Sequence, residues 1–114
     1  TMGCLMNLKD QGKIRAIGVS NDSLDQFKTY DSVGELSSNQ FRYSMLHRDR
    51  EEDILAYAAK HDIATLTYWS LEAGLLAGKV NLERVFEKND FRNHAAQWHP
   101  WYKKENITIS IKQS

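Results

Sequence analysis

The chain has 114 residues, of which 41% are hydrophobic and 26% are charged, and this composition is typical of a single globular domain. Lys and Arg together number 15, as do Asp and Glu, so the net charge favours neither a nucleic acid nor an anionic membrane as a partner. The apolar runs are too short for a membrane span and no secretory leader precedes them, which predicts a cytoplasmic protein.

The first third of the chain has the pattern of a helix, a strand and a second helix. Residues 2–11 carry apolar side chains at helical spacing and are followed by Gly12, which predicts a helix that stops there. The β-branched run over residues 14–19 predicts a strand. Ser23 is placed to cap a second helix, which we expect to end near Gly34.

The middle of the chain repeats this alternation. An apolar stretch over residues 36–43 predicts a second strand, and residues 63–68 predict a third. Between these strands, Asp49 and Glu52 have the spacing of a capping box. We therefore expect Asp49 to cap the intervening helix.

The last third of the chain lacks a clear period. Beyond Ser70 the sequence is polar and irregular, which predicts an extended loop, and the alternation of apolar residues over 107–111 favours a strand in the tail. His94 and His99 are five residues apart and no cysteine accompanies them, so we expect no metal site here.

The alternation of helices and strands predicts an α/β fold with parallel strands. Ser20 and Asn21 directly follow the first predicted strand, and in parallel α/β folds the carboxyl edge carries the binding residues. On pattern alone, other roles stay open: Ser20 and Asn21 also suit a helix cap, Gln40 suits a core amide, and Tyr68 suits a core aromatic residue.

Residues 12–21, with the sequence GKIRAIGVSN, closely resemble a segment of the aldo-keto reductases, which are (β/α)8 barrels that reduce carbonyl groups with a nicotinamide cofactor. Other segments resemble the following parts of that family in the same order, and they are residues 39–48, 61–79 and 86–92. The whole chain is then one partial aldo-keto reductase domain, family-like over residues 1–92 and divergent over residues 93–114. This resemblance implies a partial (β/α)8 TIM barrel of about three parallel strands alternating with helices, followed by an extended C-terminal loop.

The resemblance also implies a role for five residues in binding NADP(H). Ser20 and Asn21 correspond to residues that hydrogen-bond the nicotinamide carboxamide, and Gln40 to a residue that shares this task from the next strand. Hydroxyl and amide side chains suit this ligand, because a carboxamide offers one carbonyl acceptor and an NH2 donor pair. Tyr68 corresponds to the ring that stacks on the nicotinamide, and Leu71 to a residue beside the pyrophosphate.

Two departures from the family pattern lie next to these residues. The family commonly has Ser and Pro where this chain has Trp69 and Ser70, so the loop after Tyr68 loses a hydroxyl group and a rigid ring. Asn21 is followed by Asp22 where the family often has an aromatic residue. This change adds a negative charge near the expected cofactor.

The family's catalytic Asp, Tyr, Lys and His lie on strands that precede the part of the barrel represented here, and the groups that bind the adenosine phosphate lie on a later strand and helix. We therefore expect no catalytic residue in this chain, and we interpret it as a fragment that keeps the nicotinamide-binding sector. The parent enzyme would reduce aldehydes, ketones or sugar carbonyls with NADP(H). The alternative is a noncatalytic module or truncated gene product that associates with itself, or with a complementary barrel fragment, through open sheet edges.

Overall fold

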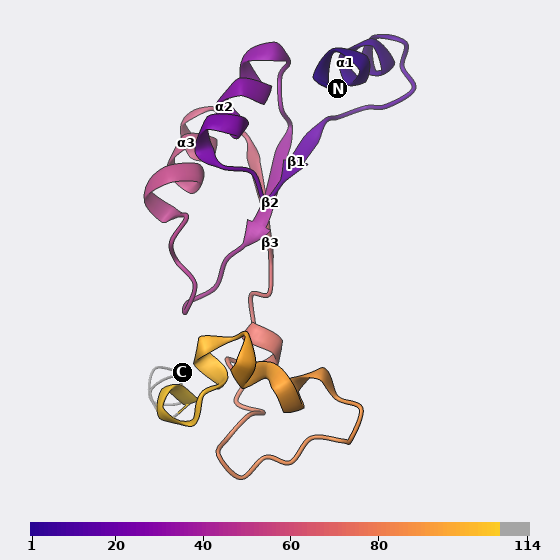
Figure 1. Cartoon of the computed structure of the whole chain (residues 1–114). Helices are drawn as coiled ribbons and strands as arrows, with labels where there is room; N and C mark the ends of the chain where they lie inside the picture. The colour runs from indigo at the N-terminus through magenta and orange to yellow at the C-terminus, as the bar shows by residue number, and fades with distance from the viewer. Residues whose placement is uncertain (108–114) are drawn as a thin grey trace. The chain divides into compact units, whose positions relative to one another are not determined.

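The computed structural model describes residues 1–107, and these form two compact units (Figure 1). The first unit consists of Thr1–Tyr43 and His47–Tyr68, and the second of Ser44–Leu46 together with the residues from Trp69 onward. Each unit has a hydrophobic core of its own.

The first unit alternates helices with parallel strands along the chain. Its three strands form one parallel sheet in the order β1-β2-β3, with Ser20 paired to Gln40 and Gln40 to Leu66 in register. In chain order the elements are α1 (Met2–Asp10), β1 (Gly18–Ser20), α2 (Leu24–Val33), β2 (Ser38–Arg42), the π-helical turn η1 (Glu51–Leu55), α3 (Ala56–Lys60) and β3 (Ala64–Tyr68). This order confirms the predicted α/β class, and the sheet is an open part of a barrel.

Helix α2 begins and ends where the sequence predicts. Gln26 N donates to Ser23 Oγ at 3.3 Å, and Ser23 N donates to the Gln26 side-chain oxygen at 2.9 Å. This reciprocal pair is a capping box, which satisfies two backbone donors that the first turn leaves free. Gly34 is the C-terminal cap of the helix, as expected.

Strand β1 is shorter than the predicted strand over residues 14–19. Its pairing begins only at Gly18, opposite Ser38, because β1 lies at the edge of the sheet and its partner β2 starts there. Ile17 precedes the ladder, although its carbonyl still accepts a hydrogen bond from Ser37 N at 2.8 Å. Strand β2 is likewise shorter than predicted, whereas β3 begins within one residue of its predicted start.

The predicted cap by Asp49 is wrong. Asp49 Oδ1 lies 3.0 Å from His47 Nε2, and the N-cap position of the following turn is Arg50, whose side chain makes no capping hydrogen bond. The carboxylate that matches the capping pattern thus has a competing partner two residues earlier. Local spacing alone did not reveal this competition.

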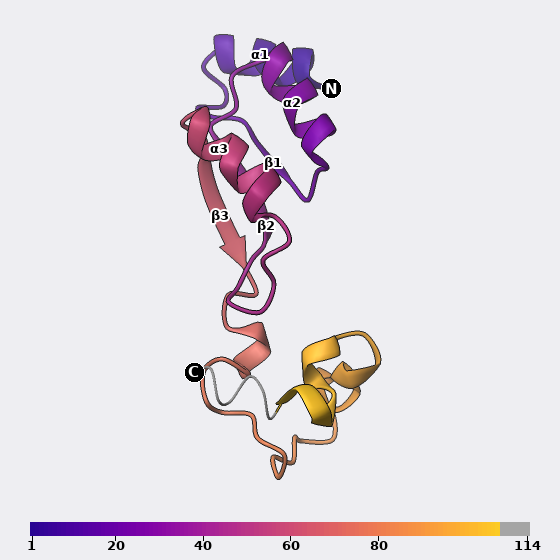
Figure 2. The same cartoon turned by 90° about the vertical axis from the view of Figure 1, so that its left-hand side faces the viewer.

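The helices cover one face of the sheet. Figures 1 and 2 show α2 and α3 on the same side of the strands, and Phe27, Phe41 and Ile54 are each at most 4% exposed in the core between them. Side chains alternate along a strand, so Gln40 and Leu66 point to the opposite face, where Leu66 is 53% exposed. Parallel sheets are normally covered on both faces, whereas within residues 1–107 this face of the sheet is bare at Gln40 and Leu66.

The second unit is built from turns and short 3-10 helices in the part that the structure describes. These helices are η2 (Glu72–Gly74), η3 (Phe91–Gln97) and η4 (Pro100–Tyr102). Its buried apolar residues are Leu75, Val80, Ala95, Tyr102 and Ile107. The irregular region predicted after Ser70 therefore folds around a small core.

The tail differs from its prediction at the one position that can be compared. Ile107 lies in a helical turn, where its N–H donates to the carbonyl oxygen of Lys103 at 3.1 Å. The predicted strand therefore does not include Ile107. The rest of that prediction, from residue 108 onward, lies outside the described residues.

A buried polar cluster links separate segments of the second unit. Glu72 and His99 are both fully buried, and His99 Nε2 lies 2.6 Å from Glu72 Oε2. Ser44 donates a hydrogen bond to the other oxygen of Glu72, and the Tyr102 hydroxyl donates to the Ala73 carbonyl at 2.9 Å. Hydrogen bonds at both carboxylate oxygens offset the cost of burying this acidic side chain.

Candidate functional site

The carboxyl edge of the sheet brings four of the predicted site residues together. Strand β1 ends at Ser20 and is followed by Asn21, Gln40 lies opposite Ser20 in register, and Tyr68 is the last residue of β3. All four belong to the first unit. The position agrees with the general placement of binding groups in parallel α/β folds.

Asn21 is at the centre of this group. The Tyr68 hydroxyl donates to Asn21 Oδ1 at 2.7 Å, and Asn21 Nδ2 donates to Ser20 Oγ at 3.2 Å. The Asn21 N–H donates to the carbonyl oxygen of Gln40 at 2.9 Å, which ties the loop after β1 to β2. Because Tyr68 lies 47 positions from Asn21, the sequence could not show that their side chains meet.

The backbone of Asn21 has a φ of 60°, in the left-handed region. Asn tolerates this region better than most residues, because its short polar side chain can form local hydrogen bonds. The conformation turns the chain away from the strand direction immediately after Ser20. It therefore sets where the Asn21 amide lies at the sheet edge.

The chemistry of the site is uncharged and polar, beside an aromatic ring. Ser20, Asn21 and Gln40 are exposed, and Tyr68 is half-buried. One hydroxyl, two amides and a phenol together supply both hydrogen-bond donors and acceptors. Such a set complements a planar ligand that carries a carboxamide.

Leu71, the fifth predicted residue, belongs to the second unit and is 59% exposed. It directly precedes η2 and lies in a turn in which Glu72 N donates to the Trp69 carbonyl at 2.8 Å. The role of Leu71 at the pyrophosphate stays a prediction.

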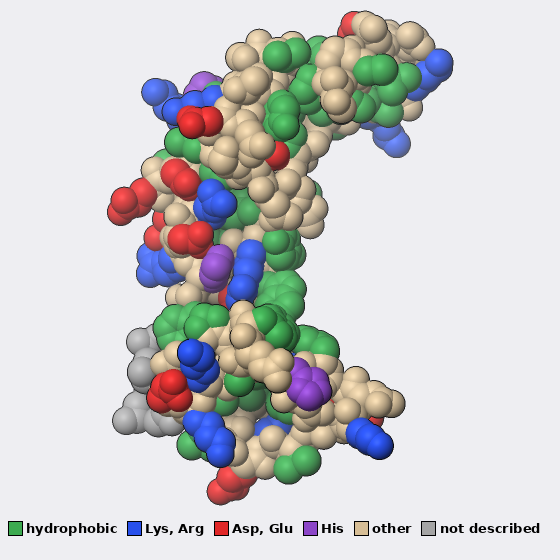
Figure 3. All heavy atoms as spheres, in the orientation of Figure 1, with side chains coloured by type: hydrophobic (Ala, Val, Ile, Leu, Met, Phe, Trp, Pro, Cys, Tyr) green, Lys and Arg blue, Asp and Glu red, His purple; other side chains and the backbone are tan. Residues whose placement is uncertain are grey.

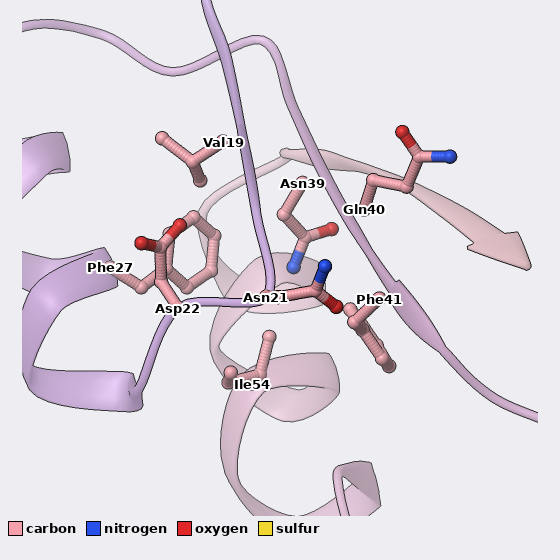
Figure 4. Close-up of a pocket in the computed structure, with 8 residues that line it drawn as sticks. All are labelled: Val19, Asn21, Asp22, Phe27, Asn39, Gln40, Phe41 and Ile54. Atoms are coloured by element: carbon pink, nitrogen blue, oxygen red, sulfur yellow. The ribbon is translucent and has the colours of Figure 1, made fainter.

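A small cavity lies beneath the loop between β1 and α2 (Figure 4). Its volume is about 10 Å³, and its polar lining residues include Asn21, Asp22 and Asn39. Figure 4 shows the Gln40 side chain pointing to the other side of β2, away from Asn39. The period of two along a strand is the sequence signal that places Asn39 and Gln40 on opposite faces of β2.

An ion-pair cluster lies beside the same edge, where Tyr43 N donates to the Tyr68 carbonyl at 3.3 Å. Arg48 donates to Glu51 through Nε and Nη2, both at 2.8 Å, and the Tyr43 hydroxyl donates to the same carboxylate. The hydrogen bonds from Arg48 and Tyr43 lower the pKa of Glu51, and the hydrogen bond to Glu51 raises the pKa of Tyr43. Figure 3 shows acidic and basic side chains intermixed on this side of the first unit, so the charges there offset one another.

Metal ligation and membrane insertion find no support within residues 1–107. No three His, Cys, Asp or Glu side chains in this range are grouped so that they could hold a metal ion. No helix of the same range has the length and apolar character needed to cross a membrane.

The sequence model of the Aldo/keto reductase family matches residues 1–114. The chain belongs to the aldo/keto reductase family. It is 47% identical over 94 residues to the aldo-keto reductase YhdN of Bacillus subtilis strain 168, and the match covers 82% of this chain and 28% of YhdN. It is 35% identical over 107 residues to the NADH-specific methylglyoxal reductase of Escherichia coli strain K12, which covers 94% of this chain and 31% of that reductase.

A solved aldo-keto reductase structure shows the same fold. The glycerol dehydrogenase AKR11B4 of Gluconobacter oxydans matches with a TM-score of 0.81 and 38% identity, over 94% of this chain and 32% of that protein. This likeness confirms the predicted partial barrel. The chain spans less than a third of the length of these relatives, at 28%, 31% and 32%.

Proposed function

We propose that this chain is the nicotinamide-binding sector of an aldo-keto reductase that transfers hydride between NADP(H) and the carbonyl carbon of an aldehyde, ketone or sugar. The observation that carries the proposal is the hydrogen-bonded set of Ser20, Asn21 and Tyr68, with Gln40 opposite Ser20 in register. Family membership supports the reaction class, and the geometry supports the position of the ligand.

Each residue of the set has a distinct task in this proposal. Ser20, Asn21 and Gln40 bind the carboxamide, whose carbonyl and NH2 groups match their hydroxyl and amide groups. Tyr68 stacks on the nicotinamide ring, and its hydrogen bond to Asn21 keeps the phenol in place. Leu71 lies along the pyrophosphate. The bound nicotinamide supplies the hydride, while these side chains orient it and select the face that is exposed to substrate.

We assign no catalytic residue to this chain. Carbonyl reduction also needs a proton donor within hydrogen-bond reach of the carbonyl oxygen, and in this proposal the donor lies on other strands of a longer barrel. Two observations support such a fragment: the chain spans less than a third of its relatives, and one face of its parallel sheet is bare. Residues 1–92 would carry the family-like sector, followed by a divergent tail over residues 93–114.

The proposal names NADP(H) because the family resemblance implies it, and NADH is the alternative dinucleotide. The groups that would bind the adenosine phosphate lie outside this chain in our interpretation, and one relative is named as NADH-specific. Both dinucleotides therefore belong in any binding experiment. The nicotinamide half should decide binding to the first unit in either case.

The test is an NMR titration of 15N-labelled chain with NADPH, NADH, reduced nicotinamide mononucleotide and adenosine 2′,5′-bisphosphate. We expect the three nicotinamide ligands to shift the signals of Ser20, Asn21, Gln40 and Tyr68, and the adenosine compound to leave them unchanged. Gln40→Ala should weaken binding of the mononucleotide about fivefold, as expected for one lost hydrogen bond.

The matched control for this titration is Gln11→Ala, which removes an exposed amide of the first unit away from the site. It should bind the mononucleotide as the unchanged chain does. Equal affinity of the Gln40 variant and the unchanged chain, or shifts confined to other residues, would contradict the assignment.

A second candidate function is a noncatalytic assembly module. Strands β1 and β3 are the two edges of the sheet, and exposed edges pair readily with other chains. Light scattering over a range of protein concentrations tests this candidate. Association without nicotinamide binding would favour it, whereas a monomer that binds nicotinamide would exclude it.

A further inference from the structure

The buried amide of Asn39 lacks a hydrogen-bond partner within the described residues. Asn39 is 4% exposed, and across residues 1–107 neither its Oδ1 nor its Nδ2 is hydrogen-bonded. Burying an amide without partners is costly, and buried polar side chains nearly always bind protein groups or ordered water. A partner for this amide is therefore expected.

A small cavity next to Asn39 offers room for such a partner. Its volume of about 10 Å³ is close to the smallest space that holds one water molecule. The apolar part of its wall comes from the sheet and from the helices above it, namely Val19, Phe27, Phe41 and Ile54. Figure 4 shows the Asn39 amide turned toward this space, with Asn21 and Asp22 lining it from the loop.

We propose that Asn39 binds one water molecule in this cavity, and that this water links β2 to the loop of Asn21 and Asp22. Buried waters typically make about three hydrogen bonds, and one amide offers two groups, so we assign the remaining hydrogen bond to the loop of Asn21 and Asp22. Asn39 is thereby a positioning residue for Asn21. Through the water it holds the loop that places the Asn21 amide at the sheet edge. The consequence for nicotinamide binding rests on the proposed function, whereas the water site does not.

In this arrangement the two adjacent amides of β2, Asn39 and Gln40, have different roles. Gln40 presents its amide on the bare face, and Asn39 presents an amide of the same kind on the helix-covered face. The loop after β1 is thus held to β2 twice: by the Asn21 N–H bond to the Gln40 carbonyl at 2.9 Å and by the water on Asn39. Two attachments hold Asn21 in its left-handed conformation more firmly than a single attachment would.

The first test uses the unchanged chain without any ligand. Water–protein NOE and rotating-frame NOE spectra should show cross peaks between the Asn39 side-chain NH2 protons and a bound water. The amide of Gln40, which is exposed to solvent, serves as the internal comparison. Absence of a bound-water signal at Asn39 would overturn the proposal.

The second test replaces the amide by an apolar side chain in Asn39→Leu, with Thr65→Val as the matched control. Thr65 pairs with Asn39 in register and does not line the cavity. We expect Asn39→Leu to change the backbone chemical shifts of Asn21, to speed hydrogen exchange of its N–H and to lower the melting temperature. The control should leave the Asn21 signals unchanged. An amide without any partner would instead give a higher melting temperature and unchanged Asn21 signals, and that result would overturn the proposal.

The last step measures affinity for reduced nicotinamide mononucleotide. Asn39→Leu should weaken binding about fivefold, although Asn39 does not touch the ligand, because Asn21 is less well positioned. If the unchanged chain shows the water but binds no nicotinamide, the proposed function fails and the water site stands. If the chain binds nicotinamide and Asn39→Leu binds it equally well, the positioning role fails and the proposed function stands.

Discussion

The backbone conformation of Asn21 decides which groups this residue can hydrogen-bond at the sheet edge. Its φ of 60° is left-handed, and its side chain and N–H together make three hydrogen bonds, to Ser20, Tyr68 and Gln40. The backbone conformation and the side-chain amide of Asn21 contribute separately to stability, because a residue without an amide can still adopt the left-handed turn. Glycine is the residue that adopts it without steric cost.

We predict that Asn21→Ala and Asn21→Gly differ in stability. Alanine in the left-handed region costs about 1 kcal/mol of backbone strain, whereas glycine is free of that cost. Asn21→Ala should therefore be about 1 kcal/mol less stable than Asn21→Gly in urea unfolding, and both should bind nicotinamide more weakly than the unchanged chain. Equal stabilities would show that the loop relaxes to another conformation when the amide is absent.

Asp90 carries the clearest perturbation of a titratable group. Hydrogen bonds from the Arg92 side chain, including one from Nε at 2.9 Å, lower the pKa of Asp90 from 3.8 to about 2. The folded carboxyl thus has a lower pKa than the unfolded one. Its contribution to stability is complete above the unfolded pKa and is lost as the pH falls toward 2.

We therefore predict a pH-dependent effect of Asp90→Asn. At pH 6 the variant should melt below the unchanged chain, and the difference should shrink between about pH 4 and pH 2, as the carboxyl of the unchanged chain becomes protonated. Thermal melts across this range provide the measurement, with Glu83→Gln as an exposed control. A difference that stays constant with pH would mean that the ionised form of Asp90 contributes nothing.

At the scale of single elements, α2 is the part of the fold that the sequence predicts best. Its capping residue, its first turn and its C-terminal Gly34 all lie within a short stretch of chain, so their pattern is visible without tertiary contacts. The turn before α3 shows the opposite case. Asp49 has the correct spacing for a cap, but its carboxylate lies against His47 instead, a contact that the capping pattern does not include.

We predict that Ser23→Ala lowers the free energy of unfolding by about 1 kcal/mol, because the N–H of Gln26 then loses its acceptor. Ser23→Asp should keep most of the stability, since a carboxylate accepts the same bond. Urea unfolding of both variants provides the comparison. Equal losses in the two variants would mean that the Ser23 side chain contributes through packing rather than capping.

At the scale of the whole molecule, the two faces of the sheet have different surroundings. Phe41 lies on the face under α2 and η1 and is 4% exposed, whereas Leu66, on the adjacent strand and the opposite face, is 53% exposed. In a closed barrel both side chains would be buried. The difference therefore reports directly on whether anything covers the second face.

We predict that Phe41→Ala costs about 3 kcal/mol or more in this chain, the usual range for a large core residue, and that Leu66→Ala costs less than about 1 kcal/mol. Chemical unfolding measures both. In a longer chain that completes the barrel, the cost of Leu66→Ala should rise to about 2 kcal/mol or more. A large cost of Leu66→Ala in the 114-residue chain would contradict the exposure of this face.

The sequence by itself determined the α/β alternation, the position of α2 and the placement of Ser20, Asn21 and Tyr68 at strand ends, because these depend on local period and capping. Only the tertiary structure decided the length of β1, the bond between Tyr68 and Asn21, the partner of Asp49, and the burial of Asn39 behind Gln40. Each of these depends on which distant segment pairs with which. The residue pattern of a segment shows that segment's periodicity. The residue at which strand pairing starts, and the partner of a side chain, depend on the distant segment that packs against it.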